Sequence, residues 1–348
     1  MPTHRQFILF AAAVSLALPA ASSAQSYTSE RARELAQERA DRAREQAQER
    51  IDREREKAQD RTDRAREKRE AREERDRAGS LDTTVTFDAR GTLNVTCPGG
   101  AVIVTGSPRN EIKVRARSES GAIRFTSNGT RATLEPSSGR GCSDGHFDVT
   151  VPAGTRVVAT TWSGSVSVHG IHGALEAHAQ SGDVDIRDAG SRLDVETLSG
   201  DVTVSAVAGE SNIHTVSGGV TLSGARGDVE IETISGDIDL RDIIAKQIRA
   251  HTTSGEVSFT GQILDAGRYE FNTHSGEIAL NLPGDIGAEL TVSTFSGGID
   301  SDFPITIKPG QHGIGASQAK RLSFTVGKGG ARINAETFSG DITLKRRR

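Results

Sequence analysis

Large aromatic side chains are scarce in this chain of 348 residues. Phe, Trp and Tyr together make up 4% of it, and there is one Trp. A core with so few large rings has to be built from Val, Ile, Leu, Ala and Thr. The net charge is also small, −4 at pH 7, so the overall balance attracts neither nucleic acid nor an acidic membrane surface. We therefore expect no nucleic-acid partner.

Long apolar runs are missing after the first residues of the chain. The apolar run at residues 7–18 follows His4 and Arg5 and precedes small residues at 22–24. This pattern is typical of a secretory signal peptide, which we assign to residues 1–24. The run is too short to span a membrane, so we expect no transmembrane segment in the mature chain. No Cys follows it closely, which argues against a lipid anchor. We expect an exported protein of the periplasm, the cell surface or the medium.

Cysteine is almost absent as well, since Cys97 and Cys142 are the two in the sequence. Two cysteines in an exported chain suggest a disulfide. We predict a bond between Cys97 and Cys142. Closing a loop of this length stabilises a fold by about 4 kcal/mol in the chain-entropy model. The alternative is two free thiols.

Residues 25–80 carry a charged repeat with a period of 11. The phrase Arg-x-Arg-Glu begins at Arg31, Arg42, Arg53 and Arg64. Eleven residues make three helical turns, so the pattern predicts a long, nearly straight α-helix over residues 30–78. Its best apolar seam is mostly Ala and buries little surface. Two interpretations stay open: a solvated single helix, or a weak coiled coil that forms a homo-oligomer.

A second repeat, built on Ser-Gly pairs, organises the rest of the chain. Its phrase is Thr, any residue, Ser, Gly, usually an acid, then Val or Ile, with a period of 18 residues at first and of 19 to 21 later. The Ser-Gly pairs are Ser163-Gly164, Ser181-Gly182, Ser199-Gly200, Ser217-Gly218, Ser235-Gly236, Ser254-Gly255, Ser275-Gly276, Ser296-Gly297 and Ser339-Gly340. A fixed period of this size is typical of a solenoid. Gly at every corner indicates a backbone angle or a close approach that a Cβ would block.

Each repeat holds two short strands with alternating apolar and polar residues. A hairpin meander would leave a sheet of about sixteen strands with one apolar face uncovered, whereas a coil closes that face inward. The prediction is an all-β fold, a single-stranded parallel β-helix of about 18–21 residues per coil, preceded by the long charged α-helix. We expect irregular coils at residues 81–160, regular coils at 161–345 and a basic tail at 346–348. The Thr two residues before each Ser is expected to face inward.

Three features together resemble a bacterial putative-adhesin β-helix family of unknown function. They are the phrase Thr-x-Ser-Gly-Asp-(Val/Ile), the segment Val-Pro-Ala-Gly at 151–154 and the ending at 336–342. The resemblance covers roughly residues 82–345. It implies a right-handed β-helix in an exported envelope protein. It supports a surface-exposed role more than a known ligand, and the charged helix lies outside it.

The repeated polar residues are explained more simply by structure than by catalysis or metal binding. The corner Ser recurs in every repeat, and His274 lies on the opposite strand face from Ser275, so we expect no catalytic residue. The corner acids are Asp183, Asp201, Asp237, Glu256, Glu277 and Asp341. Gly219 and Gly298 interrupt this column, and the glycine-rich pattern of calcium-binding β-rolls is absent.

An outward column three residues before each Ser alternates His with Glu. It begins His178, Glu196, His214, Glu232 and His251. Alternation avoids like charges on neighbouring coils, about 4.8 Å apart. Stacked His–Glu pairs on a solvated face explain this column without a metal, so we expect no metal and no cofactor.

Two classes of function remain. The first is a non-enzymatic envelope scaffold or adhesin-like module that binds a surface polymer or a protein partner. The second is a polysaccharide-active β-helix enzyme, which would need acids and bases that converge at one place. Because the polar residues are spread by repeat, we favour the first. Self-assembly by end-to-end stacking is compatible with it. The last coil, residues 333–344, would then leave an open edge that the charges of residues 345–348 protect. Two alternatives stay open for these charges: an inert, soluble tail, or a contact with an anionic envelope polymer.

Overall fold

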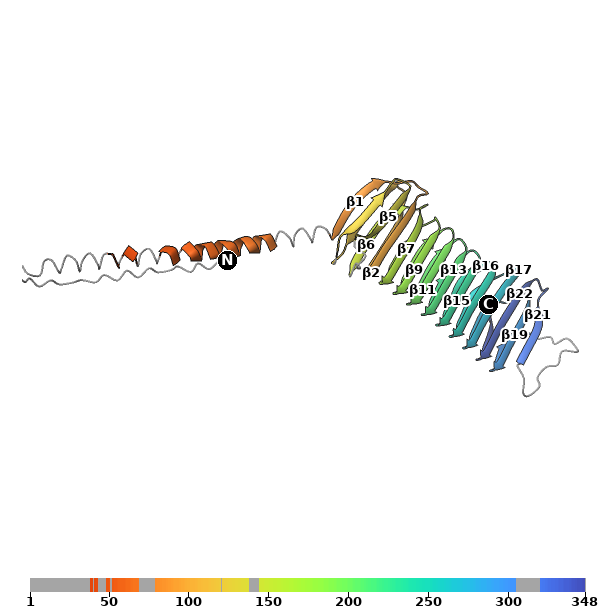
Figure 1. Cartoon of the computed structure of the whole chain (residues 1–348). Coiled ribbons are helices and arrows are strands. Elements are labelled where there is room, and N and C mark those ends of the chain that lie inside the picture. The colour runs from red at the N-terminus through yellow and green to blue at the C-terminus, as the bar shows by residue number, and fades with distance from the viewer. Residues whose placement is uncertain are drawn as a thin grey trace, which may run out of the picture. The chain divides into compact units, whose positions relative to one another are not determined.

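The computed structural model describes residues 38–39, 41–42, 48–50, 52–68, 79–119, 121–137, 144–304 and 320–347 (Figure 1). The chain divides into two compact units, residues 1–71 and residues 72–348, each described here by itself. The predicted signal peptide at residues 1–24 lies outside the described residues.

The described part of the first unit is helical and exposed throughout. Its longest described helix covers residues 52–68, and shorter helical pieces lie at 38–39, 41–42 and 48–50. Acids pair with arginines four residues on, as in Glu38–Arg42 at 2.8 Å and Asp60–Arg64 at 3.1 Å. The described helix is therefore short, where the sequence predicted a long one. The rest of the predicted span lies outside the described residues, and the oligomer stays a prediction.

The second unit consists of strands. They are β1 (Ser80–Thr86), β2 (Thr92–Ser107), β3 (Glu111–Arg117), β4 (Ile123–Ser127), β5 (Arg131–Pro136), β6 (Gly145–Pro152), β7 (Arg156–Ser163), β8 (Val166–His169), β9 (Leu175–Ser181), β10 (Val184–Ala189), β11 (Leu193–Ser199), β12 (Val202–Val207), β13 (Ser211–Ser217), β14 (Val220–Ser223), β15 (Val229–Ser235), β16 (Ile238–Ser254), β17 (Val257–Ser275), β18 (Ile278–Pro283), β19 (Ala288–Ser296), β20 (Ile299–Ser301), β21 (Lys320–Val326), β22 (Ala331–Ser339) and β23 (Ile342–Arg347).

Successive coils stack in parallel, as Figure 1 shows, and the predicted β-helix is confirmed. Thr197 pairs with Thr215 and Thr215 with Thr233 across β11, β13 and β15, while Val202 pairs with Val220 across β12 and β14. The strands before the Ser-Gly corners form a first row, and the strands after the corners form a second row. The two rows enclose the core between them. Each position of one repeat therefore pairs with the equivalent position of the next repeat.

The strands that precede the regular coils are partly antiparallel. β1 pairs with β3, β3 with β6, and β4 with β5, all in antiparallel register. β2 is the first coil of regular register, since Gly99 pairs with Ser163 and Val102 with Val166. β5 and β6 pair with the outer edge of β2 in parallel register, and the antiparallel strands β4, β3 and β1 continue the sheet beyond them.

Inward columns of small apolar residues make the core. Val195, Val204 and Ile213, for example, have no exposed surface. The Thr column is also buried, which confirms its inward direction. Its buried members are Thr161, Thr197, Thr215, Thr233, Thr252, Thr273, Thr294 and Thr337. The hydroxyls of the last four donate to corner glycine carbonyls, as in Thr252 to Gly236 at 3.1 Å. In these four coils the β-branched Thr therefore fills the core and bonds the neighbouring coil, whereas the hydroxyls of Thr161, Thr197, Thr215 and Thr233 have no hydrogen-bond partner among the described residues.

The corner glycines are required by both backbone angle and space. The φ angle lies between +134° and +156° at eight of the nine. The backbones of successive corners also touch. A Cβ on Gly218 would lie 2.1 Å from the carbonyl oxygen of Gly200, far inside van der Waals contact. No residue with a side chain fits such a corner without moving the coil below it.

A second column of unusual backbone lies at the opposite corner of the coil, four residues after the first Val. Gly170, Asp188, Ala206, Gly224 and Asp242 share a left-handed φ of +54° to +67°. Gly and Asp adopt this conformation readily, but Ala does so at a cost. The sequence pattern did not reveal this corner, because its residue types vary.

The coils do not follow one another in chain order at the C-terminal end. Ser275 of β17 pairs with Ser339 of β22, and Ser339 pairs in turn with Ser296 of β19. The last repeat is thus inserted between its two predecessors, and β23 likewise lies between β18 and β20. The expectation that residues 333–344 form an open end is wrong.

The true end of the first row is β21, which pairs with β19 in antiparallel register. It carries exposed Lys320 and Arg321, and lysines on an edge strand discourage pairing with another chain. Arg346 and Arg347, expected in a basic tail, are part of β23. The guanidinium of Arg346 donates to the carbonyl of Gly284 at 3.0 Å. The charged edge strand that discourages pairing with another chain is therefore β21, not β23.

We predict that Gly218→Ala lowers the free energy of unfolding by more than about 2 kcal/mol, because it combines a strained φ with a backbone clash. The matched control is Gly219→Ala at the next position. A Cβ there would lie 3.6 Å from its nearest neighbour, an ordinary contact. Urea unfolding of both variants measures the difference, and equal losses would refute the role assigned to the corner.

We predict that Ala206→Gly raises the free energy of unfolding by about 0.5–1 kcal/mol, because it relieves the left-handed strain. Ala208→Gly is the control, since Ala208 is exposed like Ala206 but has no positive φ. That variant should lose up to about 1 kcal/mol through the greater freedom of the unfolded chain. Thermal unfolding followed by circular dichroism compares the two, and a loss in both would contradict the strain at Ala206.

Candidate functional site

The outer face of the first row carries a column of exposed apolar side chains. It lies at the position between Thr and Ser of each repeat, where strand alternation turns the side chain outward. Its large members, which we call the apolar stripe, are Trp162, Leu198, Val216, Ile234, Phe338 and Phe295. They are 40% to 56% exposed, and the described residues contain no other large hydrophobic side chains with such exposure.

The aromatic end of the stripe is packed into a stack. The rings of His274 and Phe338 lie 4.9 Å apart with planes at 10°, and those of Phe338 and Phe295 lie 4.8 Å apart at 4°. The inserted last coil brings Phe338 between the other two. Because each ring covers the face of its neighbour, the ring faces inside the stack are not available to a ligand.

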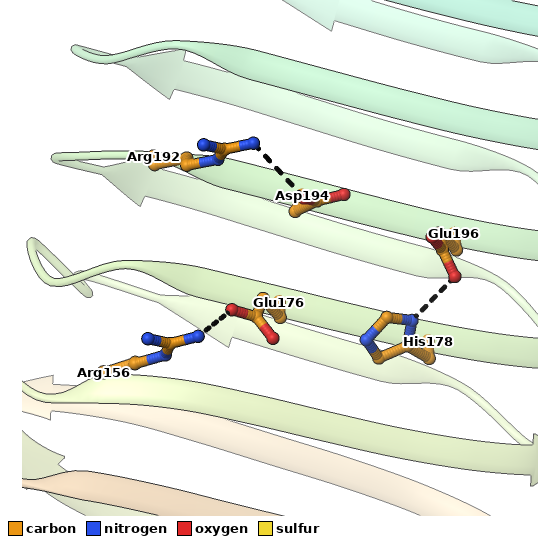
Figure 2. A network of polar contacts seen from close by, with 6 residues as sticks. All are labelled: Arg156, Glu176, His178, Arg192, Asp194 and Glu196. Carbon is orange, nitrogen blue, oxygen red and sulfur yellow. Dashed lines mark hydrogen bonds and ion pairs between the residues drawn. The ribbon is translucent and has the colours of Figure 1, made fainter.

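Polar columns run beside the apolar stripe on the same strands. His178 Nδ1 lies 3.1 Å from a carboxylate oxygen of Glu196, one coil on. Arg156 pairs with Glu176, and Arg192 with Asp194 at 3.8 Å. Figure 2 shows these three pairs on neighbouring strands. The acids of this part of the face are thus matched by cationic or imidazole groups of the chain itself.

The same pairing continues farther along the solenoid. His214 Nδ1 lies 3.4 Å from Glu232, so the predicted alternation of His and Glu does give paired residues on adjacent coils. Arg249 lies between Glu230 at 3.5 Å and Glu270 at 3.7 Å. These exposed pairs each contribute little to stability. Their main effect is to leave the sheet face without a strong field of one sign.

A groove of about 490 Å³ lies where the apolar stripe meets the polar columns. Trp162, Leu198 and Val216 line it on the apolar side, and His178, Glu196 and His214 line it on the polar side. It spans β7, β9, β11 and β13, so any ligand there contacts several coils. The groove offers apolar contact together with a few hydrogen-bonding groups, as small ligand sites and peptide sites do.

The corner acids form a second stripe, which we call the acidic column: Asp183, Asp201, Asp237, Glu256, Glu277 and Asp341. All of them are exposed. The four aspartates also accept a backbone N–H of the neighbouring coil. Examples are Gly219 N to Asp201 Oδ1 at 2.8 Å and Glu256 N to Asp237 Oδ1 at 2.7 Å. The sequence predicted solvated acids and missed this structural bond, which explains why Asp follows Gly so often.

One member of the acidic column, Glu256, has a pKa that burial and its neighbours raise. The pKa of Glu256 is raised above its ordinary value, first by partial burial and then by the negative charges of Glu277 and Asp237. At Glu256 the neighbouring carboxylates therefore oppose ionisation, and a cation placed beside them would relieve that repulsion.

The remaining predicted site residues have structural surroundings. His274 stacks on Phe338. Cys97 is buried, with Sγ 3.2 Å from the carbonyl oxygen of Gly99. Cys142 lies outside the described residues, so the disulfide stays a prediction. Within the described ranges, no group of three or more His, Cys, Asp or Glu side chains is placed to hold a metal ion.

Parallel coils with stacked Ser-Gly corners define a repetitive β-solenoid. The chain belongs to the Toastrack DUF4097 family, whose model matches residues 74–345. That match covers the strand unit up to residue 345, within β23, and confirms the family resemblance of the sequence. No curated protein matches the chain.

Two solved structures have a similar chain trace at low identity. One is described as a putative cell adhesion protein from Clostridium sporogenes, with 11% identity over 77% of this chain and 100% of that one, at a TM-score of 0.24. The other is described as a putative adhesin from Bacteroides fragilis, with 12% identity over 76% of this chain and 96% of that one, at a TM-score of 0.29. Scores this low say nothing about function. In the described part of the chain, no helix combines the length and apolar character needed to cross a membrane.

We predict that Glu256→Gln stabilises the protein more at pH 7 than at pH 4. A carboxyl whose folded pKa is raised favours folding at low pH, and this contribution is lost as the pH rises from the ordinary pKa of the carboxyl through its folded pKa. Gln removes the charge that burial and neighbouring acids oppose. Urea unfolding at both pH values measures the change.

The control for this prediction is Glu210→Gln, a change of an exposed glutamate outside the acidic column. It should shift stability by similar amounts at the two pH values. If Glu256→Gln also shifts stability equally at both, the repulsion within the acidic column is not felt in folding.

Proposed function

We propose that this protein is a non-enzymatic binding module of the cell envelope or cell surface, which holds a surface polymer or a protein partner against the apolar stripe. The observation that carries the proposal is the stripe itself. Single exposed apolar residues are ordinary, but a contiguous apolar patch on a soluble protein marks an interaction surface. Here Leu198, Val216 and Ile234 lie on three successive coils, and Phe338 and Phe295 lie on two adjacent coils farther along the same column.

The stripe has no evident structural purpose in the coil. The inward columns already close the core, and residues such as Val195 and Val202 are almost wholly buried without help from the outer face. Polar residues such as Gln180 and Thr253 occupy the same position in other coils, so the coil tolerates them there. Binding is the simplest reason to place Trp, Phe, Leu and Ile on this surface.

A non-enzymatic role is supported by the distribution of polar groups. General acid–base catalysis needs a few groups that converge and differ in environment. The acids here recur once per coil, and the His residues on the sheet face are paired with Glu, as in His178–Glu196. The corner serines follow a structural rule of the coil. The apolar run at residues 7–18 supports export to the envelope or beyond.

We expect the double variant Leu198→Ser/Ile234→Ser to keep its fold and lose retention on cell envelopes. Both side chains are about half exposed, so little core packing is lost. Removing two large apolar contacts should weaken binding about tenfold or more at about 25 cal/mol per Å². The measurement is cosedimentation of the purified protein with envelope fragments from the bacterium that produces it.

The matched control is Thr203→Ala/Thr221→Ala on the outer face of the second row. It should bind like the unaltered protein. Retention that falls equally in both double variants, or in neither, would rule out the stripe as the binding surface. Protease or glycosidase treatment of the envelopes beforehand separates a protein partner from a polymer.

A further inference from the structure

Two parallel stripes of different chemistry run along the same corner of the solenoid. In three coils a residue of the apolar stripe precedes a residue of the acidic column by three positions, and in the other coils one of the two positions is polar or glycine. Leu198 precedes Asp201, Ile234 precedes Asp237, and Phe338 precedes Asp341 in this way. Shared register keeps both stripes straight, because like positions pair from coil to coil. The corner therefore offers an apolar track with a negative track beside it.

We propose that this corner binds a basic amphipathic helix of a partner protein, lying lengthwise along the solenoid. The apolar face of the helix would cover the apolar stripe, and its Lys and Arg side chains would meet the acidic column. This inference rests on the proposed binding function and narrows it to a protein partner of stated chemistry.

Charge on the two sides of the apolar stripe favours a basic partner. On the sheet side, acids are paired within the chain, as in His178–Glu196 and Arg156–Glu176. On the corner side, the aspartates accept backbone N–H groups through Oδ1, remain exposed and pair with no cation among the described residues. The unmatched charge beside the stripe is thus negative, and a partner with positive charge there is complementary to it.

An ammonium group already lies at this corner in the structure. Lys320 Nζ donates to the carbonyl oxygen of Gly297 at 2.7 Å, at the coil that ends the first row. The contact is made by a side chain of β21, a strand outside the Ser-Gly repeat. It shows that the corner accommodates a lysine head group without disturbing the stack of coils.

The spacing of the coils suits a helix better than an extended chain. Coils lie about 4.8 Å apart, the spacing of neighbouring strands. A helix presents one turn about every 5.4 Å, so each turn meets roughly one coil over the length of the stripe. Side chains on one face of an extended chain recur about every 6.8 Å. This repeat differs more from the spacing of the coils, so an extended chain would lose the match over a shorter length.

Other occupants fit less well. Sugar rings bind aromatic side chains through the ring face, and His274, Phe338 and Phe295 cover one another's faces, which leaves Trp162 as the one exposed aromatic ring of the stripe outside the stack. Nucleic acids, anionic polymers and acidic lipids would be repelled by the acidic column. A second copy of this chain would bring another acidic column against the first. A basic amphipathic helix is complementary to both the apolar stripe and the acidic column.

The test uses synthetic peptides of about 18 residues, roughly five helical turns. The first has Leu at positions i, i+3, i+4 and i+7 and Lys elsewhere. The second has Glu in place of Lys, and the third has the composition of the first in an order that gives no apolar face. We expect the first peptide to bind the full-length protein and gain helicity by circular dichroism. The other two should bind at least about tenfold more weakly.

Protein variants locate the contact. Asp201→Asn/Asp237→Asn should weaken binding of the Lys peptide about threefold to tenfold at low salt, the scale of two exposed charge pairs. Asn keeps an oxygen that accepts the backbone N–H, so the coil stays intact. The control is Asp228→Asn directly before β15, where the Asp228 carboxylate accepts the N–H of Gln247 at 3.1 Å. It should bind unchanged, whereas Leu198→Ser/Ile234→Ser should lose at least about tenfold.

Three results would overturn the inference: no binding of the Lys peptide beyond the scrambled one, equal binding of the Glu peptide, or equal effects of Asp201→Asn/Asp237→Asn and Asp228→Asn. A dimer in light scattering that Leu198→Ser/Ile234→Ser dissolves would assign the stripe to a second copy and also overturn it. If envelope retention depends on the stripe while no peptide binds, the binding function stands and this inference fails. If envelope retention does not depend on the apolar stripe either, both the proposed binding function and this inference fail.

Discussion

The contact of one corner glycine with the corner below it is the constraint on which the rest of the solenoid depends. Backbone atoms of successive corners touch so closely that a Cβ on Gly218 would lie 2.1 Å from the carbonyl oxygen of Gly200. Such contact permits one register between coils and no other. Once that register is set, every position of the repeat stacks on its like. Inward Thr, outward apolar residues and corner acids then become continuous columns.

The acidic column shows how one residue type serves two purposes. An aspartate after the glycine accepts the N–H of the next coil, as Asp201 does from Gly219 at 2.8 Å. This bond links neighbouring coils, which gives the fold a reason to place acids in a row. The row then creates a field along one corner that no single coil would produce. A structural rule of the repeat thus generates a surface property on the scale of the whole molecule.

The sequence predicted what repeats and could not predict what breaks the repeat. The Ser-Gly phrase indicated the coil, its register and the inward Thr column, because two-residue alternation and a fixed period determine these directly. It did not indicate the order of the last coils, since Ser275, Ser296 and Ser339 carry the same phrase and any of them fits beside any other. The left-handed corner at Ala206 was missed for the opposite reason, because its residue types vary.

The apolar stripe was present in the sequence but was not recognised there. The residue between Thr and Ser was treated as arbitrary, although Trp162, Leu198, Val216 and Ile234 occupy it. The signal that would have revealed it is a column of large apolar residues on the outward phase of a strand. Pairing across coils, such as His178 with Glu196, followed from the period, whereas the bond from Asp201 to a backbone N–H required coordinates.

Insertion of the last repeat also has a consequence for how the stack of coils is completed. Coils can be added in chain order as far as β17 and β18. The next segment, β19, pairs with β21 and β22 and not with β17. Its place on the stack does not exist until β22 has been synthesised. Completion of this end therefore waits for the final residues of the chain, and an unfinished or clipped product would lack two coils rather than one.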